Sequence, residues 1–217
     1  MDEHLLYLYI ENGFGCFTPS SEWIKRVTGE LFCPHCNNIY ESVKQIDAIV
    51  NNKKRQSDVD FVFMPCGHVQ VFSTHFIDIA GPELLGRSAS FGRLLDEKGF
   101  EHEEYRAAIS RNNNVVIRGP GRAKTGRSIG ICKECDRLLY WPVGGEYVIR
   151  REVPEAPIFL SDGHLFCTPE FYERRLSIAM LRHVSMRQIP ILDEPLDGLP
   201  ASTKELRSIL KASGQVK

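Results

Sequence analysis

Short apolar runs, bounded by polar residues, glycine or proline, recur along the whole chain. Runs of this length with such boundaries are typical of buried strands, because a strand needs only a few apolar residues before a turn. We expect strands at residues 5–10, 61–64, 115–117, 147–149, 158–160 and 188–192.

Helical signals are fewer. Ser73 or Thr74 can cap a helix that begins near Phe76. A helix from Thr168 to about His183 is predicted by a capping hydroxyl followed by proline and an acid in the first turn. Further helices are expected at residues 101–112 and 200–213, and weaker helical patterning lies between residues 41 and 58. Helices and strands mix without regular alternation, which predicts an α+β fold with a mixed sheet and packed helices.

One apolar segment has an internal echo. Residues 61–68 read Phe-Val-Phe-Met-Pro-Cys-Gly-His, and residues 157–164 read Pro-Ile-Phe-Leu-Ser-Asp-Gly-His. Each copy precedes a helix cap and follows a Cys-x-x-Cys pair by about the same interval. The echo suggests two pseudo-repeats, at about residues 28–112 and 128–192, within a single domain that spans residues 1–217.

Composition narrows the class of protein. A chain of 217 residues with 42% hydrophobic content can fill its own core without disulfides. The 27 Lys and Arg balance 28 Asp and Glu, so no broad basic field is available for nucleic acid. No segment has the length and apolarity of a signal-peptide core or a membrane span. We therefore expect a cytoplasmic protein whose seven cysteines are reduced or bind metal.

Four of the cysteines form two Cys-x-x-Cys pairs, Cys33/Cys36 and Cys132/Cys135. Two thiolates at this spacing can reach one ion, and four of them complete the tetrahedron that Zn²⁺ prefers. A redox dithiol of the thioredoxin type would follow a strand in a βαβ unit, and neither pair has that setting. The pairs therefore predict a structural zinc site, with His35 exposed rather than bound to the metal.

Two arrangements of the metal remain open at this stage. In the first, all four cysteines hold one ion and connect segments far apart in the sequence. In the second, the two similar segments supply ligands for two separate ions, each held by three cysteines and one histidine. The first ion would take Cys33, Cys36, Cys66 and His68; the second would take Cys132, Cys135, His164 and Cys167.

Catalytic signatures are weak. Neither arrangement leaves a coordination position beside a glutamate, as hydrolytic zinc requires, and the sequence contains no HExxH motif. An enzyme with Cys66 or Cys167 as its nucleophile is a weaker hypothesis. We expect a non-enzymatic protein.

Residues 118–128 form a Gly-rich basic stretch that fails the phosphate-loop motif, because Ala123 stands where glycine must precede the lysine. Its cations could bind an acidic protein surface or phosphates; these are Arg118, Arg122, Lys124 and Arg127. A zinc-ribbon nucleic-acid-binding protein is therefore the alternative to a protein-binding function.

The layout of the chain resembles the double-CXXCG motif proteins known from myxobacteria, which include immunity proteins of polymorphic toxin systems. The resemblance rests on the aromatic first strand, on Trp23 shortly before the first Cys pair, on the second pair, and on the pattern from residue 158 to 189. Asn37 and Asp136 replace the glycine that follows each pair in that family. Both residue types tolerate the left-handed backbone that glycine adopts there.

This resemblance implies a protein that binds and neutralises a cognate bacterial toxin, as one member of a toxin–immunity pair. It implies no catalytic residues. The identity of the toxin and the oligomeric state are not fixed by the sequence.

Overall fold

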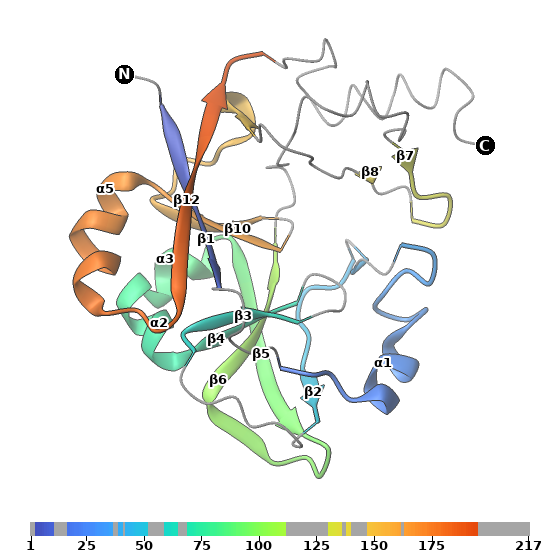
Figure 1. Cartoon of the computed structure of the whole chain (residues 1–217). Coiled ribbons are helices and arrows are strands. Elements are labelled where there is room, and N and C mark those ends of the chain that lie inside the picture. The colour runs from blue at the N-terminus through green and yellow to red at the C-terminus, as the bar shows by residue number, and fades with distance from the viewer. Residues whose placement is uncertain are drawn as a thin grey trace.

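The structure is a computed structural model that describes residues 3–10, 17–36, 39–40, 42–51, 59–64, 69–111, 130–135, 138–139, 147–161 and 163–194. These residues form an α+β fold with two five-stranded mixed sheets, one two-stranded sheet and short helices (Figure 1). This agrees with the predicted fold class. No helix in these residues is long and apolar enough to cross a membrane.

The first sheet belongs to residues that follow the first Cys pair, and its strand order is β2-β5-β6-β4-β3. β2 and β5 pair in parallel, and the other neighbouring strands of this order pair antiparallel. The strands are β2 (Ala48–Val50), β3 (Phe61–Phe63), β4 (Gln70–Ser73), β5 (Ala89–Asp96) and β6 (Glu101–Ser110).

The second sheet has the order β9-β12-β1-β11-β10. β9 and β12 pair in parallel, and the remaining neighbours in this order pair antiparallel. The strands are β1 (His4–Ile10), β9 (Val148–Ile149), β10 (Ile158–Ser161), β11 (His164–Cys167) and β12 (Val184–Leu192). In Figure 1 the first strand of the chain therefore stands beside the last described one.

Strand order and strand direction are the same in the two sheets. The sequence β2, β5, β6, β4, β3 corresponds position by position to β9, β12, β1, β11, β10. The two echoed segments form the equivalent hairpins, β3–β4 and β10–β11. The N-terminal strand β1 takes the central place that β6 takes in the first sheet.

Each hairpin leads into a helix with the same kind of cap. The Ser73 hydroxyl accepts the N–H of Phe76 at 2.9 Å, at the start of α2 (Thr74–Ala80). The Thr168 hydroxyl accepts the N–H of Phe171 at 3.2 Å, at the start of α5 (Pro169–Phe171). Both caps satisfy backbone donors that a helix start leaves without a partner.

The two halves of the protein, each built on one of the five-stranded sheets, share a core. Apolar side chains of both sheets and of the capped helices pack into one cluster; they include Leu6, Leu8, Phe61, Phe72, Phe76, Ile158, Leu160, Leu165 and Phe171. The short helix α3 (Pro82–Gly86) contacts β10, and α2 contacts η2 (Tyr172–Leu176), so helices of one half cover elements of the other.

A buried carboxylate joins the halves as well. Asp60, which precedes β3, is fully buried and accepts the Ser73 hydroxyl at 2.9 Å. It also accepts the backbone N–H of Arg182 at 2.6 Å and forms an ion pair with its guanidinium at 3.0 Å. Burial of a carboxylate is costly unless charge and hydrogen bonds compensate it, and Asp60 has both kinds of partner.

Three helix predictions were wrong in part or in full. The segment predicted as a helix at residues 101–112 is the strand β6, which lies between β4 and β5. The weak helical pattern at residues 41–58 contains the strand β2 instead. The helix after Thr168 ends with η3 (Ser177–Ala179), before His183. The strand expected at residues 115–117 and the helix expected at 200–213 lie outside the described residues.

Candidate metal centre

The first Cys pair lies in a tight turn held by backbone pairing on both sides. Phe32, just before the pair, forms an antiparallel bridge with Ile39. The turn follows α1 (Ser21–Val27), and the Phe32 carbonyl accepts the N–H of Gly29 at 2.7 Å. The Phe32 ring is fully buried against Trp23, with ring centroids 5.7 Å apart, so the turn is anchored in the core of the first half.

The second Cys pair lies in an equivalent turn. It connects β7 (Gly130–Ile131) to β8 (Leu138–Leu139), and Ile131 pairs with Leu138. In both turns the residue before the first cysteine pairs with the third residue after the second cysteine. The two turns therefore present their cysteines in the same local geometry.

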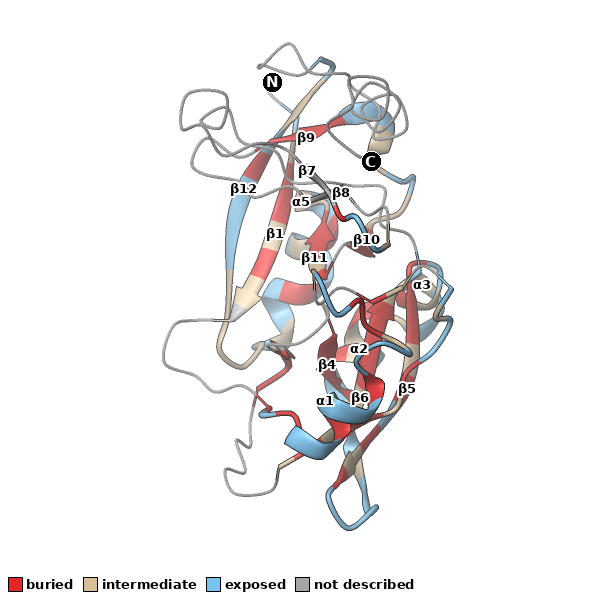
Figure 2. Cartoon of the chain, turned by 90° about the vertical axis from the view of Figure 1, so that its right-hand side faces the viewer, coloured by how far each residue is buried: buried red, intermediate tan, exposed pale blue. Residues whose placement is uncertain are grey.

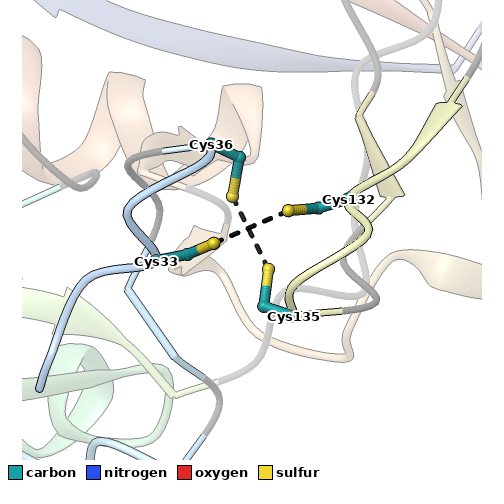
Figure 3. A group of neighbouring side chains, drawn as sticks. All are labelled: Cys33, Cys36, Cys132 and Cys135. Atoms are coloured by element: carbon teal, nitrogen blue, oxygen red, sulfur yellow. Dashed lines mark hydrogen bonds between the residues drawn. The ribbon is translucent and has the colours of Figure 1, made fainter. Parts of the chain in front are cut away.

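The four cysteine sulfurs converge on one point (Figure 3). The Sγ atoms of Cys33 and Cys132 lie 3.6 Å apart, as do those of Cys36 and Cys135. All four sulfurs lie within 4.8 Å of one another. In a tetrahedral site with Zn–S bonds of about 2.3 Å, neighbouring sulfurs stand about 3.8 Å apart. The observed spacing fits a shared metal ion and is far too long for disulfide bonds of about 2.05 Å.

Hydrogen bonds favour the thiolate form of the first cysteine in spite of its burial. Cys33 and Cys132 are fully buried, and Cys36 and Cys135 are half-buried. Burial by itself raises the pKa of Cys33, but hydrogen bonds from the backbone of Cys36 and His35 and from neighbouring thiols lower this pKa to about 7. A depressed thiol pKa is what a metal ligand requires, because only the thiolate binds the ion.

Tyr40 lies close enough to the cluster to sense its charge. Burial raises the pKa of its phenol, and the negative charges of Cys33, Cys135 and Glu134 raise that pKa further. The phenol therefore stays neutral. Tyr40 was not among the residues predicted from the sequence; the available signal was its position four residues after Cys36.

Residues of the rival two-ion arrangement lie in other surroundings. Cys167 packs in the shared core, where burial raises its pKa to about 12. The ring of His164 contacts Tyr7, with 3.3 Å between Nδ1 and the phenol oxygen. Within the described ranges, the group that could hold a metal contains Cys33, Cys36, Cys132 and Cys135 together. Cys66 and His68 fall outside those ranges, as do Arg118, Arg122, Lys124 and Arg127.

His35 is exposed, as predicted, and is not part of this group. Four thiolates around one ion fill the coordination sphere and leave no position for a water or substrate. Such a site acts structurally, because metal binding contributes directly to folding free energy. Cys33 and Cys36 follow α1, whereas Cys132 and Cys135 precede β9, so an ion here would connect the two halves.

Comparison of the sequence with models of known protein families finds no match, and comparison with curated proteins finds no significant match either.

Proposed function

We propose that the four cysteines hold a single structural Zn²⁺ that clamps the two halves of the protein together. The observation that carries this proposal is the convergence of four sulfurs from two equivalent turns. The all-thiolate donor set selects soft ions, and zinc is the common tetrahedral choice in a structural site. Removal of the ion is expected to separate the two turns and loosen the fold.

We further infer that the two halves arose by duplication of one unit. The shared strand order, the shared strand directions and the pair of capped hairpins support this inference. The Cys turn of each half precedes the four other strands of its sheet, with β6 and β1 set aside. In the second half the strand equivalent to β6 is the N-terminal strand β1. This is expected if the start and end of the repeated unit shifted along the chain after the duplication.

At the level of biology, we propose a non-enzymatic immunity protein that binds and neutralises a cognate bacterial toxin. The double Cys-pair layout and its resemblance to immunity proteins of polymorphic toxin systems support this proposal. A closed four-thiolate site also fits a protein whose activity depends on the shape of its surface rather than on catalysis at the metal.

Co-expression with the toxin encoded by the neighbouring reading frame tests the proposal. The unmodified protein should restore growth of cells that express the toxin, whereas Cys36→Ser should restore it poorly because the clamp is lost. Failure of the unmodified protein to rescue growth would remove the immunity function.

Titration in vitro tests the non-enzymatic part of the proposal. An inhibitor that acts by binding should silence the purified toxin at a ratio near one to one. Full inhibition at a small fraction of that ratio would indicate an enzyme that modifies the toxin. Binding to generic DNA or RNA at low salt, with a steep loss at higher salt, would support the nucleic-acid alternative instead.

A further inference from the structure

A cavity of about 310 Å³ lies between the two halves of the protein. Phe61 and Gln70 line it from β3 and β4 of the first half, and Tyr7 and His164 line it from β1 and β11 of the second. β1 and β11 stand above β4 in Figure 2, so the cavity lies where the two sheets meet. Small-molecule sites have volumes of about 300–1,000 Å³. At about 30 Å³ for each water of the liquid, this cavity would hold about ten waters, or a ring compound of about ten non-hydrogen atoms.

The wall of the cavity is mostly apolar and aromatic. Leu8, Phe61 and Leu165 are at most 4% exposed. The rings of Tyr7 and His164 are half-buried, which marks their side of the cavity as the entrance. The described lining contains no Asp, Glu, Lys or Arg. Such a wall suits a neutral ligand, because an ionised group would lose its hydration there without gaining a partner of opposite charge.

One buried polar atom in the described wall has no partner. Gln70 is 4% exposed, and its Nε2 donates to the carbonyl oxygen of Gly163. This bond fixes the orientation of the amide, because a reversed amide would set two acceptor oxygens against each other. The remaining amide atom, Oε1, finds no hydrogen-bond donor among the described residues. A buried acceptor without a partner costs free energy, and a donor on a ligand would recover that cost.

Contacts around the aromatic side of the cavity hold it in place. Nδ1 of His164 lies 3.3 Å from the phenol oxygen of Tyr7, and the two rings meet edge to face with centroids 5.3 Å apart. The Arg187 guanidinium lies 4.8 Å from the centre of the Tyr7 ring. A site that is formed before the ligand arrives loses less conformational entropy on binding.

We propose that this cavity binds a small, neutral aromatic heterocycle whose ring N–H donates to Oε1 of Gln70. The flat ring would lie against the apolar and aromatic wall and would contact both halves of the protein at once. The cavity shares no lining residue with the metal centre. The inference therefore goes beyond the immunity function and does not depend on it.

Two other occupants fit less well. Buried water makes about three hydrogen bonds per molecule, and a mostly apolar wall does not provide them for about ten waters. A nucleobase carries several donors and acceptors, most of which would lose their hydrogen bonds to water against such a wall. A single N–H on an otherwise apolar ring matches the single unpartnered acceptor of Gln70.

Indole and 1-methylindole are the probes that test the proposal, because methylation removes the N–H donor and adds only one carbon. Isothermal titration calorimetry with the full-length, zinc-loaded protein should show that indole binds at least about tenfold more tightly. Gln70→Met removes the acceptor and keeps the length of the side chain. In this variant the affinity for indole should fall by about tenfold, whereas the affinity for 1-methylindole should stay within about twofold of its original value.

NMR spectra of the aromatic side chains locate the site. The ring resonances of Tyr7, Tyr9 and His164 should shift when indole is added, because all three residues line the cavity. Tyr9 is half-buried, so Tyr9→Ser should fold and should weaken binding of both probes by about fivefold or more. Phe100→Ser is the matched control, because Phe100 presents a ring that is 70% exposed outside the cavity, at the turn between β5 and β6. It should leave both affinities within about twofold, and thermal melting should show that each variant is folded.

Three results would overturn the inference. The first is the absence of binding at about 5 mM of either probe. The second is equal affinity for the two probes in the unmodified protein, or an equal loss of both in Gln70→Met, because the N–H would then make no contact with the amide. The third is a set of NMR shifts confined to rings outside the cavity. If Gln70→Met does not fold, the comparison of the two probes and the Tyr9→Ser variant still decide. Rescue from the toxin is measured separately, so failure of this site would leave the immunity function standing.

Discussion

The Sγ atoms of Cys33 and Cys132 lie 3.6 Å apart although 99 positions separate the two residues in the chain. Cys36 and Cys135 repeat the same separation in sequence and in space. The two Cys turns therefore meet with their first cysteines together and their second cysteines together, as two equivalent turns do around a shared ion. Because one turn follows α1 and the other precedes β9, an ion held between them would link metal binding to the assembly of the two halves.

The arrangement of the four cysteines predicts the metal content of the purified protein. We expect one zinc ion per purified chain, and Cys36→Ser should lose most of it after dialysis against a mild chelator. The thermal midpoint should fall by about 10 °C or more, because the binding free energy of the ion is also folding free energy. Elemental analysis and thermal melting measure the two quantities. Cys167→Ala is the control: it changes a core cysteine and should leave the metal content unchanged, whereas two zinc ions per chain would contradict the shared site.

The metal-free protein should become more stable as the pH rises from about 7 to about 9. The pKa of Cys33 is lowered to about 7 in the folded protein, whereas an unfolded thiol titrates near 9. A group with a lowered folded pKa contributes stability above its unfolded pKa and loses that contribution as the pH falls through the folded value. Thermal melting in a chelator across this range measures the effect. Cys33→Ser should flatten the dependence, and an equally steep dependence in that variant would rule out Cys33 as its source.

The buried contacts of Asp60, which join the halves, should stabilise the protein far more than an exposed ion pair does. Asp60→Ala is expected to lower the free energy of unfolding by about 3 kcal/mol, because it removes a fully buried acceptor from Ser73 and Arg182. Arg174→Ala breaks the exposed pair with Glu170 and should cost about 0.5 kcal/mol or less. Denaturant unfolding of the zinc-loaded proteins compares the two, and equal costs would argue against a structural link at Asp60.

One glycine permits a close backbone approach in the first sheet. A Cβ atom on Gly92 would lie 1.9 Å from the carbonyl oxygen of Ile46, so Gly92→Ala should destabilise the protein by about 3 kcal/mol. At Gly86 the same substitution meets no atom within 4 Å, and alanine should stabilise the end of α3 by about 0.5 kcal/mol. The two substitutions should therefore change the free energy of unfolding in opposite directions, which denaturant unfolding measures. A neutral Gly92→Ala would show that the segment before β2 can move away from β5 at little cost.

Local sequence patterns correctly predicted several strands and the starts of two helices. The strands at residues 5–10, 61–64 and 158–160 match β1, β3 and β10 closely. The capping hydroxyls of Ser73 and Thr168 start helices as expected. These predictions succeeded because short apolar runs and helix caps act over a few residues.

The prediction at residues 101–112 failed for a physical reason. This segment contains glutamate, alanine and arginine, which favour helices in isolation. In the folded protein it forms the centre of a sheet, where β4 and β5 pair with it on both sides. Hydrogen bonds to two neighbouring strands and burial of Tyr105, Ala107 and Ile109 outweigh a weak local preference.

The Cys-x-x-Cys spacing by itself predicted that the four sulfurs could bind metal, because two thiolates at that spacing fit one ion whatever the rest of the fold does. It left open which pairs share an ion. That choice depends on how two distant turns approach each other, and the tertiary structure places all four sulfurs together while Cys167 packs in the core. The tertiary structure likewise decided that β1 completes the second sheet, since strand pairing across the whole chain is set by packing and not by local sequence.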